Sequence, residues 1–138
     1  MRKRTQAREL ALQMLYQINV TQDDLPDSLA IFWKAHPSPA TVKEFTEMLV
    51  KGTITNLTLV DRTLSKYARN WKIKRMAIVD RNILRMAIYE LLFCADIPPK
   101  VSINEAINIA KKYGDANSGK FVNGILDKIR KSEVSEKV

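Results

Sequence analysis

Apolar residues recur along this chain every three or four positions, and not at the alternate positions typical of strands. The first stripe consists of Ala7, Leu10, Ala11, Met14, Leu15 and Ile18. Side chains with this spacing lie on one face of an α-helix, which predicts a helix over about residues 5–18. A shorter helix should follow, opened by Pro26 and Asp27 and ending near Ala35.

The longest stripe consists of Val42, Phe45, Leu49, Thr53, Leu57, Val60, Leu64 and Ala68. It predicts one amphipathic helix of up to about seven turns. Gly52 is its weakest point, since glycine lowers helix stability. Two starts fit equally: Ser38 as N-cap before Pro39, or a capping box of Thr41 and Glu44.

The second half of the chain predicts three further helices and a short turn near residues 73–78. The apolar positions are Val79, Ile83, Leu84, Ala87, Ile88, Leu91 and Leu92 in one helix, and Phe121, Val122, Ile125, Leu126 and Ile129 in the last. Between them, Ser102 and Glu105 predict a capping box, opening a helix that ends at Gly114. The last residues, 132–138, should be frayed.

No strand pattern or internal repeat is visible, and the 138 residues contain only four glycines and five prolines. We therefore predict an all-α fold of about seven helices in a single domain spanning residues 1–138. No stretch approaches the ~20 apolar residues of a membrane span. The single cysteine, Cys94, lies in an apolar run and should be buried, which favours a cytoplasmic protein.

The net charge of +8 is unevenly distributed. Residues 1–20 carry +3, residues 21–50 carry −3, residues 51–100 carry +6 and residues 101–138 carry +2. A strongly basic start followed by an acidic segment indicates a polyanionic partner on one side and a basic partner on another.

The basic head, defined as Arg2, Lys3, Arg4, Gln6 and Arg8, is the first candidate site. A signal peptide also begins with basic residues, but Glu9 interrupts the apolar stretch that follows, so the head should belong to the folded protein. Arg4 and Arg8 are one helical turn apart and should line one exposed edge, where they would bind RNA phosphates. If Thr5 is the N-cap, the helix N-terminus adds N–H donors. The alternative is a solvated cluster that only aids solubility.

The second candidate site is the segment DANSGKFVNG, residues 115–124. Asn117, Ser118 and Lys120 at a helix start suit contacts with phosphates or base edges. Phe121 fits either stacking on a base or packing in the core. Trp71, between cations, fits RNA stacking or closing one end of a helix bundle, and we favour the latter.

Catalytic machinery is not visible. His36 stands alone without a metal-binding partner, and the glycines are too isolated for a phosphate loop. We expect the carboxylates of Asp61, Asp80, Glu90 and Asp127 to pair with surrounding arginines and lysines. The sequence predicts no enzyme, no cofactor and no metal site.

Four segments carry a family resemblance. They are R-x-x-A-R-E-x-A-L-Q-x-L-Y (residues 4–16), V-D-R-N-I-L-R-M-A-I-Y-E-L (79–91), P-x-K-V-S-I-N-E-A-I-x-x-A-K-K-Y-G (98–114) and K-F-V-N-G-I-L-D-K-I (120–129). Together they resemble the NusB family of transcription antitermination factors. The resemblance implies two packed three-helix bundles without enzymatic activity. It also implies binding to the boxA element of nascent ribosomal RNA, with NusE, a small-subunit ribosomal protein, within an RNA polymerase antitermination complex.

The resemblance assigns RNA binding to Arg2, Lys3, Arg4, Gln6, Arg8, Asn117, Ser118, Lys120 and Phe121, and NusE binding to Tyr16 and Asp80. Thr5 and Gln6 stand where some members extend the arginine run, and Asn117 is neutral where some carry an acid. Some members form homodimers. The alternatives are a helical protein–protein scaffold, the RNA-recruiting domain of a ribosomal RNA methyltransferase, and a DNA-binding repressor, for which no recognition helix is visible.

Overall fold

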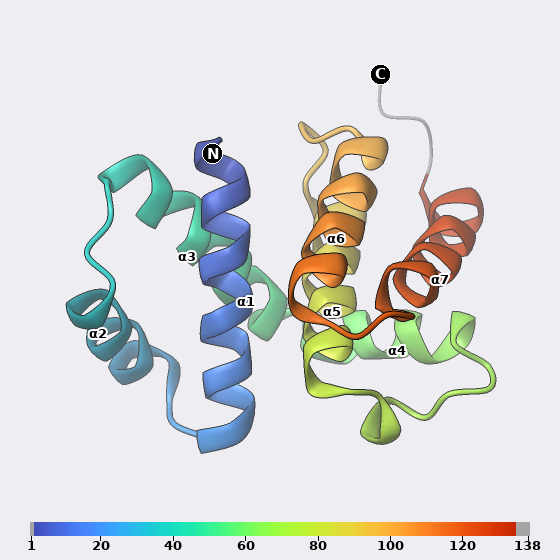
Figure 1. Ribbon diagram of the computed structural model, residues 1–138, viewed down its shortest axis with the longest axis horizontal. Coiled ribbons are helices and arrows are strands. Elements are labelled where there is room, and N and C mark those ends of the chain that lie inside the picture. Colours follow the sequence, from blue (N-terminus) through green and yellow to red (C-terminus); the bar gives the residue numbers. More distant parts are fainter. Residues whose placement is uncertain (1, 135–138) are drawn as a thin grey trace. The chain divides into compact units, whose positions relative to one another are not determined.

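The computed structural model describes residues 2–134, which form seven α-helices and one short 3₁₀ helix without any strand (Figure 1). The elements are α1 (Lys3–Thr21), α2 (Leu25–Ala35), α3 (Ala40–Thr55), α4 (Leu57–Tyr67), η1 (Ile73–Arg75), α5 (Ile78–Phe93), α6 (Pro99–Tyr113) and α7 (Ser118–Glu133). The prediction of an all-α fold with about seven helices is therefore confirmed. The frayed end predicted from residue 132 is helical as far as Glu133, and residues 135–138 lie outside the described part.

The chain divides into two compact units: the first ends at Thr55 and the second begins at Asn56. In the first unit, α1 packs along α3, and α2 packs against α1 (Figure 1). The fully or almost fully buried apolar side chains of these helices include Ala7, Ala11, Met14, Phe32, Val42 and Leu49. Their spacing is the predicted one, because one face of each helix is removed from water.

In the second unit, α5 contacts α4, α6 and α7, and is its central element (Figure 1). Its buried face carries Ile83, Leu84, Ala87, Ile88 and Leu91. The Arg85 guanidinium donates two hydrogen bonds of 2.8 Å to the carboxylate of Asp61, which ties α5 to α4. A bidentate arginine–carboxylate pair fixes the relative orientation of the two side chains in addition to pairing their charges.

The predicted helix over residues 42–68 is wrong in one respect: it is interrupted. The helix α3 ends at Thr55 and α4 begins at Leu57, with Asn56 between them at φ −104° and ψ 21°. The break falls after three β-branched residues, Thr53, Ile54 and Thr55, which favour helices only weakly. Gly52, predicted as the weak point, lies inside α3.

Two predicted helix starts are also corrected. The helix α1 begins at Lys3, so Arg2 and not Thr5 occupies the N-cap position. The helix α6 begins at Pro99, because proline suits a first helical turn, and Ser102 therefore lies inside the helix. The Ser102 hydroxyl donates a buried 2.9 Å hydrogen bond to Glu90 Oε1, joining α6 to α5 in place of the predicted capping box.

Candidate nucleic-acid interface

The basic head lies on the first turns of α1. The side chains of Arg2, Lys3, Arg4 and Gln6 are exposed, whereas Arg8 is only 2% exposed. The predicted exposed edge therefore includes Arg4 but not Arg8. Position 8 falls on the buried face of α1, between the buried positions of Ala7 and Ala11, so its guanidinium is covered by the fold.

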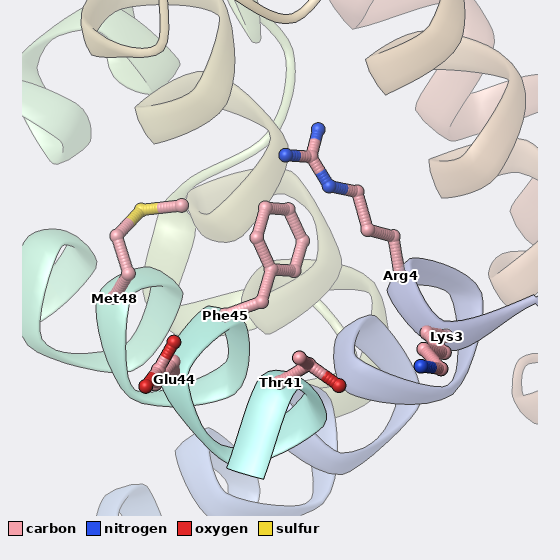
Figure 2. A pocket seen from close by; sticks show the side chains of 6 residues that line it. All are labelled: Lys3, Arg4, Thr41, Glu44, Phe45 and Met48. Atoms are coloured by element: carbon pink, nitrogen blue, oxygen red, sulfur yellow. The ribbon is translucent and has the colours of Figure 1, made fainter. Parts of the chain in front are cut away.

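A groove of about 420 Å³ lies between the start of α1 and the start of α3. It is lined by Lys3, Arg4, Thr41, Glu44, Phe45 and Met48 (Figure 2). The guanidinium carbon of Arg4 lies 4.6 Å from the centroid of the Phe45 ring, and that of Arg8 lies 5.3 Å from it. The ring face is electron-rich and attracts both cations.

This arrangement positions the Arg4 guanidinium without using its hydrogen-bond donors. A guanidinium stacked on an aromatic ring keeps its in-plane N–H groups for a second partner, and phosphate oxygens match that fork. In Figure 2, Arg4 extends beside the Phe45 ring, while Glu44 lies on the far side of the groove from Arg4. The groove thus presents an ordered cation at its rim.

In the second unit, the loop before α7 is held by its own side chains. The Ser118 hydroxyl accepts a 3.0 Å hydrogen bond from the Asp115 N–H, and Asp115 Oδ1 accepts a 2.8 Å bond from the Asn117 N–H. Ser118 is 1% exposed, so its hydroxyl is not at the surface that a direct RNA contact requires. Asn117 and Lys120 are exposed on either side of it.

A pocket of about 410 Å³ lies next to this loop, lined by Trp71, Arg75, Met76, Ala77, Asp80, Asp115, Asn117 and Phe121. Trp71 packs edge-to-face on Phe121, with ring centroids 5.5 Å apart. Trp71 is 54% exposed, so its ring packs on α7 with one part and faces solvent with the rest. Its ring forms part of a concave surface that is open to a ligand.

The structure brings some of the predicted residues together. Asp80, predicted to bind NusE, lines the same pocket as Asn117 and Phe121, predicted to bind RNA. Tyr16, the other predicted NusE residue, is 44% exposed on α1. The basic head and Tyr16 belong to the first unit, and the remaining predicted residues belong to the second.

Most of the carboxylates singled out in the sequence have partners. Asp61 pairs with Arg85 and Asp127 with Lys131, at 2.8 and 2.9 Å, which confirms the expectation for these two. Asp80 differs: it is 7% exposed, and its Oδ1 has no hydrogen-bond partner among residues 2–134. The expected pairing of Asp80 with a neighbouring cation is therefore wrong. Arg81, next in sequence, projects elsewhere and donates to the Ile73 carbonyl at 3.3 Å.

Other chemistry is limited over residues 2–134. No three histidine, cysteine or acidic side chains in this range gather into a possible metal site. No helix of the same range combines the length and hydrophobicity needed to cross a bilayer. The His36 ring stacks on Phe32 at 4.2 Å, and its Nδ1 lies 3.1 Å from the Phe32 carbonyl oxygen, so its contacts are those of a helix end.

The sequence indicated the cations but missed the side chains that organise them. Periodicity assigns Phe45 to the apolar stripe of a core, although its side chain is half-buried and covered by arginines. Arg75 and Trp71 also line a pocket that periodicity does not reveal. The sequence signals for that pocket were the run of cations around Trp71 and the candidate residues Asn117 and Phe121, which periodicity does not connect with one another.

Fold and sites together define an all-α protein of two helical units, with a cationic helix start on one and an aromatic, acid-containing pocket on the other. Residues 5–131 match the NusB family. The chain belongs to the NusB family.

The most informative relatives agree with this assignment. The transcription antitermination protein NusB of Anaeromyxobacter sp. (strain Fw109-5) is 51% identical, over 92% of this chain and 89% of its own. The NusB structure from T. maritima is 40% identical, with a TM-score of 0.86 over 96% of this chain and 93% of its own. A crystal structure of the antitermination factors NusB and NusE in complex with double-stranded RNA has a 28% identical chain, with a TM-score of 0.86 over 96% of this chain and 98% of that one.

Proposed function

We propose that this protein is a non-catalytic RNA-binding adaptor that binds the boxA element of nascent ribosomal RNA together with NusE, and so supports transcription antitermination and ribosome biogenesis. Its family relatives carry the antitermination name, and a similar chain has been crystallised with NusE and RNA. The RNA-binding residues are Arg2, Lys3, Arg4, Gln6, Asn117, Lys120 and Phe121. Arg8 and Ser118 are buried and act indirectly, Arg8 through its contact with Phe45 and Ser118 through its hydrogen bond with Asp115.

The observation that carries this proposal is the stacking of Arg4 on Phe45 at the rim of the groove in the first unit. A solubilising charge needs no fixed orientation, whereas an arginine held on an aromatic ring has lost rotamer freedom before any ligand arrives. An ordered guanidinium beside exposed Lys3 suits phosphate recognition along a single strand.

Fluorescence anisotropy of a labelled boxA RNA tests the proposal. A scrambled RNA and a duplex DNA are measured at the same salt concentration, since affinity for nucleic acid depends on salt. We expect boxA to bind more tightly than either competitor. Equal, weak binding to all three would reduce the basic head to a nonspecific electrostatic patch.

A matched pair of variants separates the head from overall charge. Arg4→Ala should weaken boxA binding, whereas Arg62→Ala, which removes the same charge from an exposed position on α4, should not. Helical circular dichroism and melting of both variants should match the parent protein. Equal losses from both variants would show that only net charge matters.

NusE should raise the affinity for boxA by adding its own contacts, so that the two proteins bind RNA cooperatively. We propose Tyr16 and Asp80 as NusE contacts. Titrating boxA with and without saturating NusE measures the coupling, and Tyr16→Ala should reduce it without changing RNA affinity in the absence of NusE. If NusE leaves RNA affinity unchanged at fixed salt, the cooperative mechanism fails.

A further inference from the structure

The groove between α1 and α3 brings three kinds of side chain together around one hollow (Figure 2). The lining side chains are Lys3 and Arg4 from α1, and Thr41, Glu44, Phe45 and Met48 from α3. The hollow therefore has a cationic side, an apolar part, and a side that carries a hydroxyl and a carboxylate. Binding of phosphates uses only the cationic side, so it gives the α3 side chains no direct contact with RNA.

Glu44 is the side chain that phosphate binding does not explain. An exposed carboxylate close to bound phosphates repels them and lowers affinity. Glu44 is exposed, and within residues 2–134 its carboxylate has no ion-pair partner, whereas Glu47, one turn further along α3, pairs with Lys51 at 3.2 Å. The Glu44 oxygens are therefore available to accept hydrogen bonds from a ligand in the groove.

The order of the side chains across the groove matches the parts of a nucleotide. In Figure 2, the Phe45 side chain lies between those of Glu44 and Arg4. A nucleotide likewise has a phosphate at one end, then a flat ring with apolar faces, and then an edge of hydrogen-bond donors and acceptors. The half-buried Phe45 and Met48 supply the apolar part of the groove. Its volume of about 420 Å³ lies within the ~300–1,000 Å³ range of small-ligand sites.

We propose that this groove binds an RNA base that carries an exocyclic amino group, which donates to Glu44 while Lys3 and Arg4 bind the adjacent phosphate. Cytosine, adenine and guanine have such a group, and a glutamate that accepts from cytosine N4 is a common base contact. Uracil has carbonyl oxygens on both sides of its single N–H donor, so a carboxylate at that edge meets acceptors. Glu44 therefore selects against uracil. The inference rests on the proposed RNA-binding function and adds base selection to it.

The test uses the full-length protein and an oligouridine RNA in which one central nucleoside is changed, measured by fluorescence anisotropy at fixed salt. The central nucleoside is cytidine, adenosine, or the ribonucleoside of pyrimidin-2-one, which is cytidine without its amino group. We expect the cytidine and adenosine RNAs to bind about fivefold more tightly than oligouridine itself. The pyrimidin-2-one RNA should lose most of this gain, because the groove recognises the amino group.

Two variants assign the effect to Glu44. Glu44→Gln should reduce the preference for cytidine over uridine to less than about twofold, because an amide also offers a donor to the uracil carbonyl. The preference is a ratio of two affinities, so the general gain from removing a negative charge cancels. Asp23→Asn, the same change at an exposed position between α1 and α2, is the control and should keep the preference. Melting curves verify that both variants are folded.

The outcomes separate this inference from the proposed function. If boxA RNA binds and cytidine has no advantage over uridine, the RNA-binding function stands and base selection in the groove is overturned. If Glu44→Gln tightens every RNA equally and the cytidine preference remains, Glu44 only repels phosphates, and its assignment to the base is overturned. If neither boxA nor any of the oligouridine RNAs binds, both proposals fail.

Discussion

The guanidinium of Arg4 lies 4.6 Å from the centroid of the Phe45 ring, and the buried Arg8 lies 5.3 Å from the same ring. One aromatic side chain on α3 therefore contacts two arginines from successive turns of α1. Phe45 is a positioning residue: it contacts Arg4, which is proposed to bind RNA, and the buried Arg8.

Replacing Phe45 by leucine should weaken boxA binding. The change keeps an apolar side chain but removes the π face that holds Arg4, an interaction worth about 0.5–1 kcal/mol at exposed sites. We expect the Kd for RNA to rise about two- to fivefold. Phe45→Tyr, which retains the ring face, is the control and should bind normally. An unchanged Kd for the leucine variant, with parental melting, would show that Arg4 needs no positioning.

Substitutions of Arg8 and Arg4 by alanine should differ in their effects on stability. Removing the buried Arg8 side chain by Arg8→Ala leaves space in the first unit and a ring without its buried cation, so unfolding free energy should fall by about 1–3 kcal/mol. Arg4→Ala, at an exposed position, should lower it by no more than about 1 kcal/mol, which is the worth of its contact with Phe45. Urea unfolding followed by circular dichroism measures both. Equal stability of the two variants would contradict the buried placement of Arg8.

The salt dependence of RNA binding should report the number of cations that contact phosphates. Arg2, Lys3, Arg4 and Lys120 are exposed and proposed to contact phosphates, so the slope of log K against log salt should be about −3, at ~0.7 per contact. Arg4→Ala should reduce it to about −2. Arg8→Ala should leave the slope unchanged, which distinguishes a lost phosphate contact from a destabilised fold. A smaller slope in the Arg8 variant would mean that this guanidinium reaches RNA.

Two glycines near the α7 loop should respond in opposite ways to alanine. A Cβ at Gly114 would lie 2.6 Å from Ser118 Cβ and 2.8 Å from the Ala110 carbonyl oxygen, which is backbone and moves only at a cost. Gly114→Ala should therefore destabilise the protein by about 1–3 kcal/mol. A Cβ at Gly124 would have no neighbour within 4 Å, and this glycine lies inside α7, so Gly124→Ala should stabilise by about 0.5–1 kcal/mol. Thermal melting compares them, and a stable Gly114 variant would contradict the tight packing of this loop.

Local periodicity predicted the helices because each buries one face, and that information lies within a few residues of sequence. It did not predict the break at Asn56, where three weak helix formers together end α3 although none of them does so alone. Nor did it place Arg8, whose burial depends on Phe45 from a different helix. Asp80 was expected to pair with neighbouring cations, but consecutive residues on a helix do not face each other.

The candidate residues in the basic head were visible as charges, and those near α7 as polar residues at a helix start. Which of these residues are exposed and which are buried could not be predicted from the sequence. Ser118 and Asn117 are adjacent and chemically similar, yet one is 1% exposed and the other exposed, because the Ser118 hydroxyl turns inward to the Asp115 N–H. Hydrogen-bond geometry determines which of the two side chains is buried, and this geometry cannot be predicted from composition.

The bonds between Asp115, Asn117 and Ser118 have a thermodynamic consequence for recognition. Ordering one backbone residue costs about 1–2 kcal/mol of conformational entropy. Because this loop closes on its own side chains at 2.8 and 3.0 Å, that ordering accompanies folding of the second unit. An RNA arriving at Asn117 meets a preorganised surface, and its contacts there contribute to affinity with little entropy lost in the protein.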